Sequence, residues 1–175
     1  LVKENDYSLE ELREDQGFHR VSQAHGSPEL IQCIVFELLS LSLYELLKLN
    51  EFEGIRMDFI RRFAIQLLNA LAFLRKLRII HSDIKPENVL LKSKSKTGTC
   101  VCKVGIKLID FGTSMHTHEN GFDYIQSRYY RAPEVILGHP YSTPIDMWST
   151  GCVLAELFLG LHYLQETISR NSLAL

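Results

Sequence analysis

Cysteine is scarce in this sequence of 175 residues, and its spacing argues against the usual cysteine-based sites. Of the four cysteines, only Cys100 and Cys102 lie close together. Their C-x-C spacing differs from the C-x-x-C spacing that is typical of zinc and redox sites. We therefore expect reduced thiols that are buried or lie on strands.

Long hydrophobic runs are missing as well. The longest apolar stretch, from Gly151 to Leu161, is interrupted by Glu156 and falls far short of the roughly 20 residues that span a bilayer. No signal-peptide pattern is visible, so we expect an intracellular protein, cytoplasmic, nuclear or both. The sequence opens on Leu1 rather than methionine, which is compatible with a fragment.

Neither sign of charge is in excess. The 19 lysines and arginines and the 21 aspartates and glutamates leave a formal net charge of −2, without a long run of one sign. This pattern predicts no nucleic-acid partner and no membrane surface. With 46% hydrophobic and 23% charged residues, the composition is typical of a globular chain with one sizeable core.

The first half of the chain predicts one strand and two helices. Ile31–Phe36 is apolar and rich in β-branched residues, which indicates a buried strand. Ser42 and Glu45 form a capping box, so a helix should begin there. From Asp58, apolar residues recur at helical spacing and predict a long amphipathic helix. Its expected core-facing residues are Ile60, Phe63, Ala64, Leu67, Leu68, Leu71 and Leu74.

The second half predicts short strands and a final helix. A strand is expected at Arg78–Ile80, after the long helix ends near Leu77. The runs 89–91 and 107–109 should pair as a hairpin, joined through the polar turn 92–99 and the alternating residues 101–104. Thr143 and Pro144 predict an N-cap followed by proline at the first helical position, and Gly160 predicts the end of that helix.

Polar residues recur at fixed spacing between apolar flanks in the stretch IIHSDIKPENVLL, which runs from Ile79 to Leu91. The predicted strands on both sides should hold this loop rigidly. Taken alone, His81, Asp83, Lys85 and Asn88 could form a hydrogen-bonded structural loop. A catalytic loop is the alternative, and residues farther along the chain decide between the two.

Two triplets follow in a fixed order, Asp110-Phe111-Gly112 at a strand end and Ala132-Pro133-Glu134 after a polar segment. The order H-x-D-x-x-x-x-N, D-F-G, A-P-E is typical of protein kinases. The chain therefore resembles the protein kinase catalytic domain from about Ile31 to Gly160. His81-Ser82-Asp83, in place of the usual His-Arg-Asp, and the segment Tyr124 to Glu134 resemble the dual-specificity tyrosine-regulated kinases of the CMGC group, with homeodomain-interacting kinases as near relatives.

The resemblance implies a fold of the α+β class, the protein-kinase-like fold, made mostly of the helical large lobe with a remnant of the small-lobe sheet. Residues 1–30 would be unplaced or a small-lobe remnant, residues 31–160 the hinge and large-lobe core, and residues 161–175 a divergent tail.

The resemblance also implies an ATP-dependent enzyme that phosphorylates serine and threonine in protein substrates. Asp83 would orient the substrate hydroxyl and accept its proton, and Lys85 would contact the γ-phosphate. Asn88 and Asp110 would ligate Mg²⁺, because hard oxygen donors suit that ion. The purine would bind the carbonyl of Glu37 and the amide of Leu39, with Phe36 behind them.

Tyr124 is the expected site of self-phosphorylation. A phosphate there would carry about two negative charges, and Arg128 and Arg131 are spaced to pair with it. The alternative is that these arginines are merely solvated. Phe122 stands where many tyrosine-regulated kinases have a second tyrosine. Asp146 resembles the buried acid that ties the catalytic loop to the next helix, and Glu134 lacks its expected arginine partner.

Several kinase features are missing from the sequence. Ahead of the predicted hinge, Gly17 and Gly26 are the only glycines and Lys3 is the only lysine, so neither a glycine-rich loop nor a usable strand lysine is present. The distal helices are not recognisable after Gly160. We therefore expect this chain alone to be inactive and poorly soluble, with uncovered faces on the helix Thr143–Leu159.

Two alternatives to an active kinase remain at this point. One is a non-catalytic, kinase-like binding module, and the other is a nonfunctional fragment. The intact Asp83, Asn88 and Asp110 favour the enzyme. A metal site at His116, His118 and Glu119 is disfavoured, because no further ligands stand at a recognisable spacing.

Overall fold

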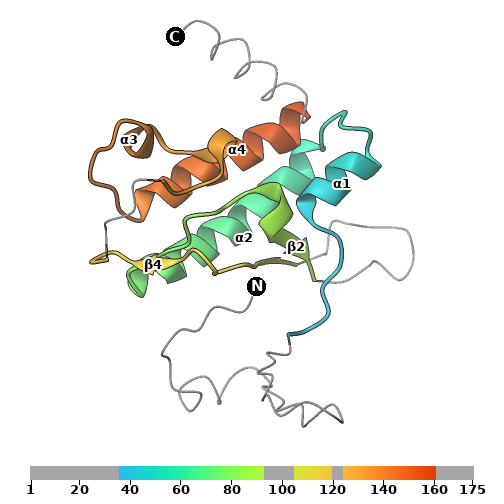
Figure 1. The fold of residues 1–175 in the computed structure, drawn as a ribbon. Coiled ribbons are helices and arrows are strands. Elements are labelled where there is room, and N and C mark those ends of the chain that lie inside the picture. Colours follow the sequence, from blue (N-terminus) through green and yellow to red (C-terminus); the bar gives the residue numbers. More distant parts are fainter. Residues whose placement is uncertain (1–35, 93–104, 120–123, 161–175) are drawn as a thin grey trace, which may run out of the picture. The chain divides into compact units, whose positions relative to one another are not determined.

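The computed structural model describes residues 36–92, 105–119 and 124–160 (Figure 1). The chain divides into two compact units, Leu1–Leu38 and Leu39–Leu175, and the elements below belong to the second. Several predictions fall outside the described residues. They concern the run 31–35, the turn 93–99 and residues 101–104, the end segments 1–30 and 161–175, and Lys3, Gly17, Gly26, Cys33, Cys100, Cys102 and Phe122.

Helices and small sheets alternate along the described chain, so the mixed α and β composition expected from the sequence is present. This arrangement is consistent with part of the fold that the resemblance implied. In chain order the elements are α1 (Leu43–Leu49), α2 (Met57–Lys76), β1 (Ile79–Ile80), a 3₁₀ turn (Pro86–Asn88), β2 (Val89–Leu91), β3 (Ile106–Leu108), β4 (Met115–His116), a second 3₁₀ turn (Arg128–Tyr130), α3 (Pro133–Ile136) and α4 (Pro144–Leu159).

The capping box at the start of α1 is confirmed. The amide of Glu45 donates to the Ser42 hydroxyl at 3.1 Å, and the amide of Ser42 donates to the Glu45 carboxylate at 2.8 Å. Both partners satisfy backbone donors that the first helical turn leaves without an intrahelical acceptor. The short helix then buries Leu43 and Leu47 in the main core.

The long helix α2 lies beside α4 and forms the centre of the core (Figure 1). Val153 and Leu157 of α4 belong to the same buried cluster as the apolar residues of α2. Leu68 was expected in this core but is 43% exposed, because it stands about 100° round the helix from Leu67. The remaining predicted residues of α2 are buried, except that Ala64 is half-buried; the buried ones are Ile60, Phe63, Leu67, Leu71 and Leu74.

Two small antiparallel sheets frame the polar loop after α2. The predicted antiparallel pairing of the two strands is present, with Val89 opposite Leu108, although the second strand begins one residue earlier than expected. Strand β1 is shorter than predicted, because Arg78 adopts a left-handed conformation with φ of +57° and still belongs to the turn that ends α2. The pairing of β1 with β4, which places Ile80 opposite Met115, was not predicted.

Helix α4 begins at Pro144 and ends before Gly160, as predicted. Thr143 occupies the predicted N-cap position, although its backbone is already helical and its side chain makes no capping hydrogen bond within the described residues. Gly160 has φ of +85°, and a Cβ there would stand 1.9 Å from the carbonyl oxygen of Phe52. Only glycine permits this approach between the end of α4 and the loop before α2.

The expected uncovered face of α4 is present in the described part of the chain. Met147, Trp148 and Phe158 are each about half exposed, with 48%, 49% and 52% of their surface accessible. No helix among the described residues is long and apolar enough to cross a membrane.

Candidate active site

The polar loop after β1 is anchored to α4 by one buried carboxylate. The amide of His81 donates to Asp146 at 2.8 Å, and the amide of Ser82 donates to the other carboxylate oxygen at 3.0 Å. Burial raises the pKa of Asp146 to about 6, although these two hydrogen bonds act in the opposite direction. The structure thus shows the tie between loop and helix that the sequence led us to expect.

His81 holds the segment around Asp110. Its Nε2 lies 3.0 Å from the carbonyl oxygen of Ile109, and its Nδ1 accepts a hydrogen bond from the amide of Asp83 at 3.2 Å. Its ring packs edge-on against that of Phe111, with 4.7 Å between the ring centroids. Burial lowers the pKa of His81, so the neutral ring with the proton on Nε2 satisfies both contacts. His81 therefore joins the two predicted catalytic segments and serves as a structural link.

Asp83 is the half-buried centre of a hydrogen-bond network. Lys85 Nζ lies 2.7 Å from its Oδ2, and Asn88 Nδ2 donates to the same oxygen at 3.2 Å and to the Asp83 carbonyl at 2.9 Å. Burial by itself would raise the pKa of Asp83, but hydrogen bonds from Lys85 and Ser127 outweigh it and hold the pKa below its usual value. The carboxylate is therefore ionised at neutral pH and can accept a proton.

Ser127 completes this network, and sequence reasoning missed it. Its hydroxyl donates to Asp83 Oδ1 at 2.7 Å and lies 3.3 Å from Lys85 Nζ. The serine stands 44 residues from Asp83 in the sequence, and no spacing rule connects the two. A serine among polar residues near Tyr124 was visible in the sequence, but its contact depends on how the segment after β4 folds back.

The two expected magnesium ligands lie at the ends of paired strands, Asn88 just before β2 and Asp110 two residues after β3. The amide of Ile109 donates to the carbonyl of Asn88 at 2.9 Å, which brings the residue before Asp110 against Asn88. The Asn88 amide nitrogen points to Asp83, so its side-chain oxygen is the atom suited to a cation. The exposed Asp110 carboxylate and the buried Asn88 amide are hard oxygen donors, and this donor set fits Mg²⁺.

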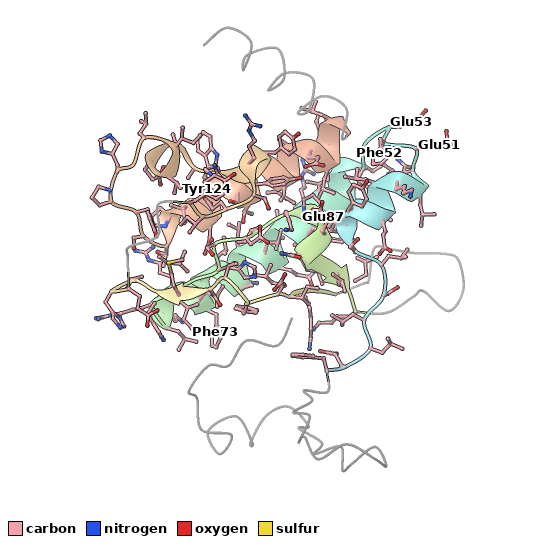
Figure 2. All side chains as sticks on the ribbon, in the orientation of Figure 1. Glu51, Phe52, Glu53, Phe73, Glu87 and Tyr124 are labelled. Carbon is pink, nitrogen blue, oxygen red and sulfur yellow. The ribbon has the colours of Figure 1, made fainter. Side chains whose placement is uncertain are left out.

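Tyr124 and Arg131 are already in contact. Tyr124, labelled in Figure 2, is 78% exposed, and the guanidinium of Arg131 stands 4.1 Å from its ring centroid. A hydrogen bond from Arg131, its positive charge and that of Arg128 lower the pKa of the Tyr124 hydroxyl. Arg131 also donates to the carbonyls of Ile125 at 2.8 Å and Gln126 at 2.9 Å. Arg131 therefore already contacts Tyr124, whereas the pairing of Arg128 and Arg131 with a phosphate stays a prediction.

Gln126 fixes this segment on α4 and was also missed. Its side-chain nitrogen donates to Ile145 O at 3.0 Å and Ser149 Oγ at 2.7 Å, and its side-chain oxygen accepts from the Ala132 amide at 2.8 Å. Gln126 has φ of +64° and is buried. A non-glycine residue keeps such a conformation only where the surroundings hold it, and these three contacts do so.

A buried tyrosine and glutamate form a second link to α4. The Tyr130 hydroxyl donates to Glu156 Oε2 at 2.6 Å, and Glu156 Oε1 has no hydrogen-bond partner among the described residues. Burial raises the pKa of Glu156 to about 7. Glu134 lies in α3 and is half-buried, so its expected pairing stays a prediction.

The nucleotide contacts and the alternative metal site are the remaining predictions. Glu37 and Leu39 stand on either side of the division between the two compact units, so their nucleotide contacts stay predictions. His116 and His118 stack with ring centroids 5.4 Å apart, and the amide of His116 donates to Glu119 at 2.9 Å. The described residues contain no group of three histidine, cysteine, aspartate or glutamate side chains that could hold a metal ion.

Comparison with known proteins shows that the chain is similar to protein kinases. The model of the protein kinase domain matches residues 21–174. The chain is 54% identical over 128 residues to the probable serine/threonine-protein kinase dyrk2 of Dictyostelium discoideum, an overlap of 73% of this chain and 13% of that protein. It is 51% identical over 144 residues to the dual specificity tyrosine-phosphorylation-regulated kinase mbk-2 of Caenorhabditis elegans, with shares of 82% and 17%.

A human relative gives the same result. The chain is 50% identical over 128 residues to human dual specificity tyrosine-phosphorylation-regulated kinase 4, with shares of 73% and 23%. In these three comparisons the chain spans between 13% and 23% of the length of the curated relatives it matches.

Proposed function

We propose that this chain, which belongs to the dual-specificity tyrosine-regulated branch of the protein kinase domain family, forms the catalytic core of an ATP-dependent kinase. Its substrates would be serine and threonine residues of proteins. The observation that carries the proposal is the Asp83 carboxylate, ionised and held by Lys85, Asn88 and Ser127.

Asp83 suits the role of proton acceptor. Phosphoryl transfer needs an aligned hydroxyl and neutralised phosphate charge more than it needs covalent help from the protein. As the substrate oxygen bonds to the γ-phosphorus of ATP, the bond from that phosphorus to the bridging oxygen breaks and ADP leaves, while the hydroxyl proton passes to the Asp83 carboxylate. The contacts from Lys85 and Ser127 keep that carboxylate in one orientation before the reaction.

Lys85 supplies positive charge beside the proton acceptor. Its ammonium group lies between the Asp83 carboxylate and the Ser127 hydroxyl, so its position is set before ATP binds. From there it stabilises charge on the transferred phosphoryl group. Asn88 and Asp110 would hold Mg²⁺, which when bound neutralises the phosphate oxygens of ATP. The Glu37 carbonyl and the Leu39 amide would bind the purine.

Tyr124 is the proposed site of self-phosphorylation. The hydroxyl is exposed, and a phosphate on it would gain charge-assisted hydrogen bonds from Arg128 and Arg131. Because Arg131 already binds the carbonyls of Ile125 and Gln126, the phosphate would reinforce the conformation that presents Ser127 to Asp83. We infer that Tyr124 phosphorylation stabilises the catalytic arrangement.

The test compares variants in a protein that contains this chain together with a complete nucleotide site. Phosphate transfer from ATP to a serine- and threonine-containing protein is measured for Asp83→Asn and for the control Asp58→Asn. Asp83→Asn should lower kcat by about 10² or more, and Asp58→Asn should leave it unchanged. Equal activity in both variants would exclude Asp83 as the proton acceptor. Protein binding without ATP binding or phosphate transfer would favour the non-catalytic module instead.

A further inference from the structure

Ser82 has no role in the proposed reaction, although it lies between His81 and Asp83. Only 1% of its surface is exposed, and its φ is +66°, in the left-handed region. A buried serine in this conformation is unfavourable by itself, so its surroundings must hold it there. The general protein-kinase pattern has arginine at this position, whereas the side chain here is short and neutral.

The Ser82 hydroxyl reaches across to the segment that follows Gly112. It donates to the carbonyl oxygen of Thr113 at 2.7 Å, while the Ser82 amide is held by Asp146 at 3.0 Å. Ser82 thus binds Asp146 of α4 through its amide and the Thr113 carbonyl through its hydroxyl. Both contacts are well within hydrogen-bond distance.

His81 and Ser82 contact the chain before and after Asp110. His81 binds the carbonyl of Ile109 and packs on the ring of Phe111, whereas Ser82 binds the carbonyl of Thr113. Asp110 itself has φ of +64° and is exposed. Two consecutive loop residues therefore hold the backbone on both sides of an exposed carboxylate.

The hydrogen bond from Ser82 to Thr113 matters because it directly follows the flexible Gly112. Glycine allows the backbone many conformations, and the turn here is closed by the amide of Ser114, which donates to the Phe111 carbonyl at 3.1 Å. A turn hydrogen bond alone does not attach this segment to the polar loop. The Ser82 hydroxyl supplies that attachment directly after the glycine.

We propose that Ser82 is a positioning residue whose hydroxyl holds the segment after Gly112 and thereby keeps the Asp110 carboxylate in place for a divalent cation. The consequence for the cation rests on the proposed kinase function, whereas the effect on the backbone does not. Ser82 touches neither substrate nor metal in this role, because it acts through Thr113.

The first test measures hydrogen exchange of this chain by mass spectrometry. In Ser82→Ala, amides in the segment 109–116 should exchange about fivefold faster, the population change expected from one lost hydrogen bond. Ser82→Gly should show the same increase although it relieves the left-handed strain. Ser82→Cys, with a weaker donor of similar size, should fall between. The control is Ser142→Ala, since Ser142 is exposed before α4.

Two outcomes would overturn the positioning role. One is unchanged exchange in 109–116 in both Ser82→Ala and Ser82→Gly. The other is faster exchange spread equally over α2, which would show general destabilisation without a local attachment. If Ser82→Ala does not fold, Ser82→Gly and Ser82→Cys decide the question, because glycine suits the backbone and cysteine keeps the volume.

The second test uses the complete kinase and varies the Mg²⁺ concentration. Ser82→Ala should raise the Mg²⁺ concentration for half-maximal activity about fivefold and leave kcat at saturating Mg²⁺ largely unchanged. A lower kcat without a shift in Mg²⁺ dependence would contradict the proposal. If the wild-type protein transfers no phosphate, the proposed function fails, while the exchange experiment still decides whether Ser82 positions the segment.

Discussion

The hydroxyl of Ser127 donates a hydrogen bond to the Oδ1 atom of Asp83 at 2.7 Å. This contact joins the segment that carries Tyr124 to the proposed proton acceptor. It also contributes to the lowered pKa of Asp83, together with the hydrogen bond from Lys85. The conformation of the segment after β4 therefore bears directly on the chemistry of the catalytic loop.

Replacing Ser127 should alter the pH dependence of the kinase. In Ser127→Ala the Asp83 carboxylate loses a donor that stabilises its charged form, so its pKa rises. The acidic limb of the kcat/KM profile should therefore move to higher pH. Ser127→Thr keeps the hydroxyl and should keep the profile. A profile that shifts equally in both variants would contradict the role of this contact.

Asp110→Ala should abolish phosphate incorporation at Tyr124. The variant removes a carboxylate that would hold Mg²⁺. Without the bound Mg²⁺, the negative charge of the ATP phosphates is not neutralised. Mass spectrometry of Tyr124-containing peptides from the complete protein provides the measurement. Asp58→Ala, an exposed change in α2, serves as the control and should retain the modification. Continued self-phosphorylation in Asp110→Ala would show that the metal ligand is assigned wrongly.

Glu156 should make the fold less stable as the pH rises. Its pKa is about 7 in the fold against an ordinary value of 4.5, so the folded state binds the proton more tightly than the unfolded chain. This contribution is fully present below pH 4.5 and is lost as the pH rises through 7. Asp146, raised to about 6, acts in the same direction.

The check is urea unfolding of the chain between pH 5 and 8. Wild type should lose on the order of 2 kcal/mol from Glu156 over this range, and Glu156→Gln should lose clearly less. Asp58→Asn, at an exposed carboxylate, should follow the wild type. A pH dependence that survives unchanged in Glu156→Gln would mean that another group causes it.

Gly160→Ala should be strongly destabilising. The new Cβ would stand 1.9 Å from the Phe52 carbonyl oxygen, and the left-handed φ of +85° is unfavourable for alanine. We expect a loss of about 2 kcal/mol or more in the free energy of unfolding. Gly151→Ala is the matched control in α4, where a Cβ meets nothing within 4 Å and should stabilise by about 0.5 to 1 kcal/mol. Equal effects of the two changes in thermal unfolding would refute the close approach.

Local signals in the sequence predicted the helices well. The capping box of Ser42 and Glu45, the proline at position 144 and the glycine at position 160 each depend on a few adjacent residues, and each defines a helix end in the structure. The core-facing stripe of α2 was predicted except for Leu68, which lies at the edge of the stripe. Periodicity locates the centre of an apolar face better than its borders.

The family, the order of the motifs and the residue types that phosphoryl transfer needs could all be recognised in the amino-acid sequence. Asp83, Lys85, Asn88 and Asp110 could be singled out because their spacing is a local property of the chain. Their roles stay predictions until the variants are measured.

The distant groups that contact these residues could be identified only from the folded structure. The contacts of Ser127 with Asp83, Ser82 with Thr113 and Tyr130 with Glu156 span 44, 31 and 26 residues. Such contacts depend on how segments fold back on α4, and a serine or a glutamine carries no periodic signal that announces its partner. The pKa values follow the same rule, because burial and distant donors, set by the whole fold, determine whether each carboxylate is charged.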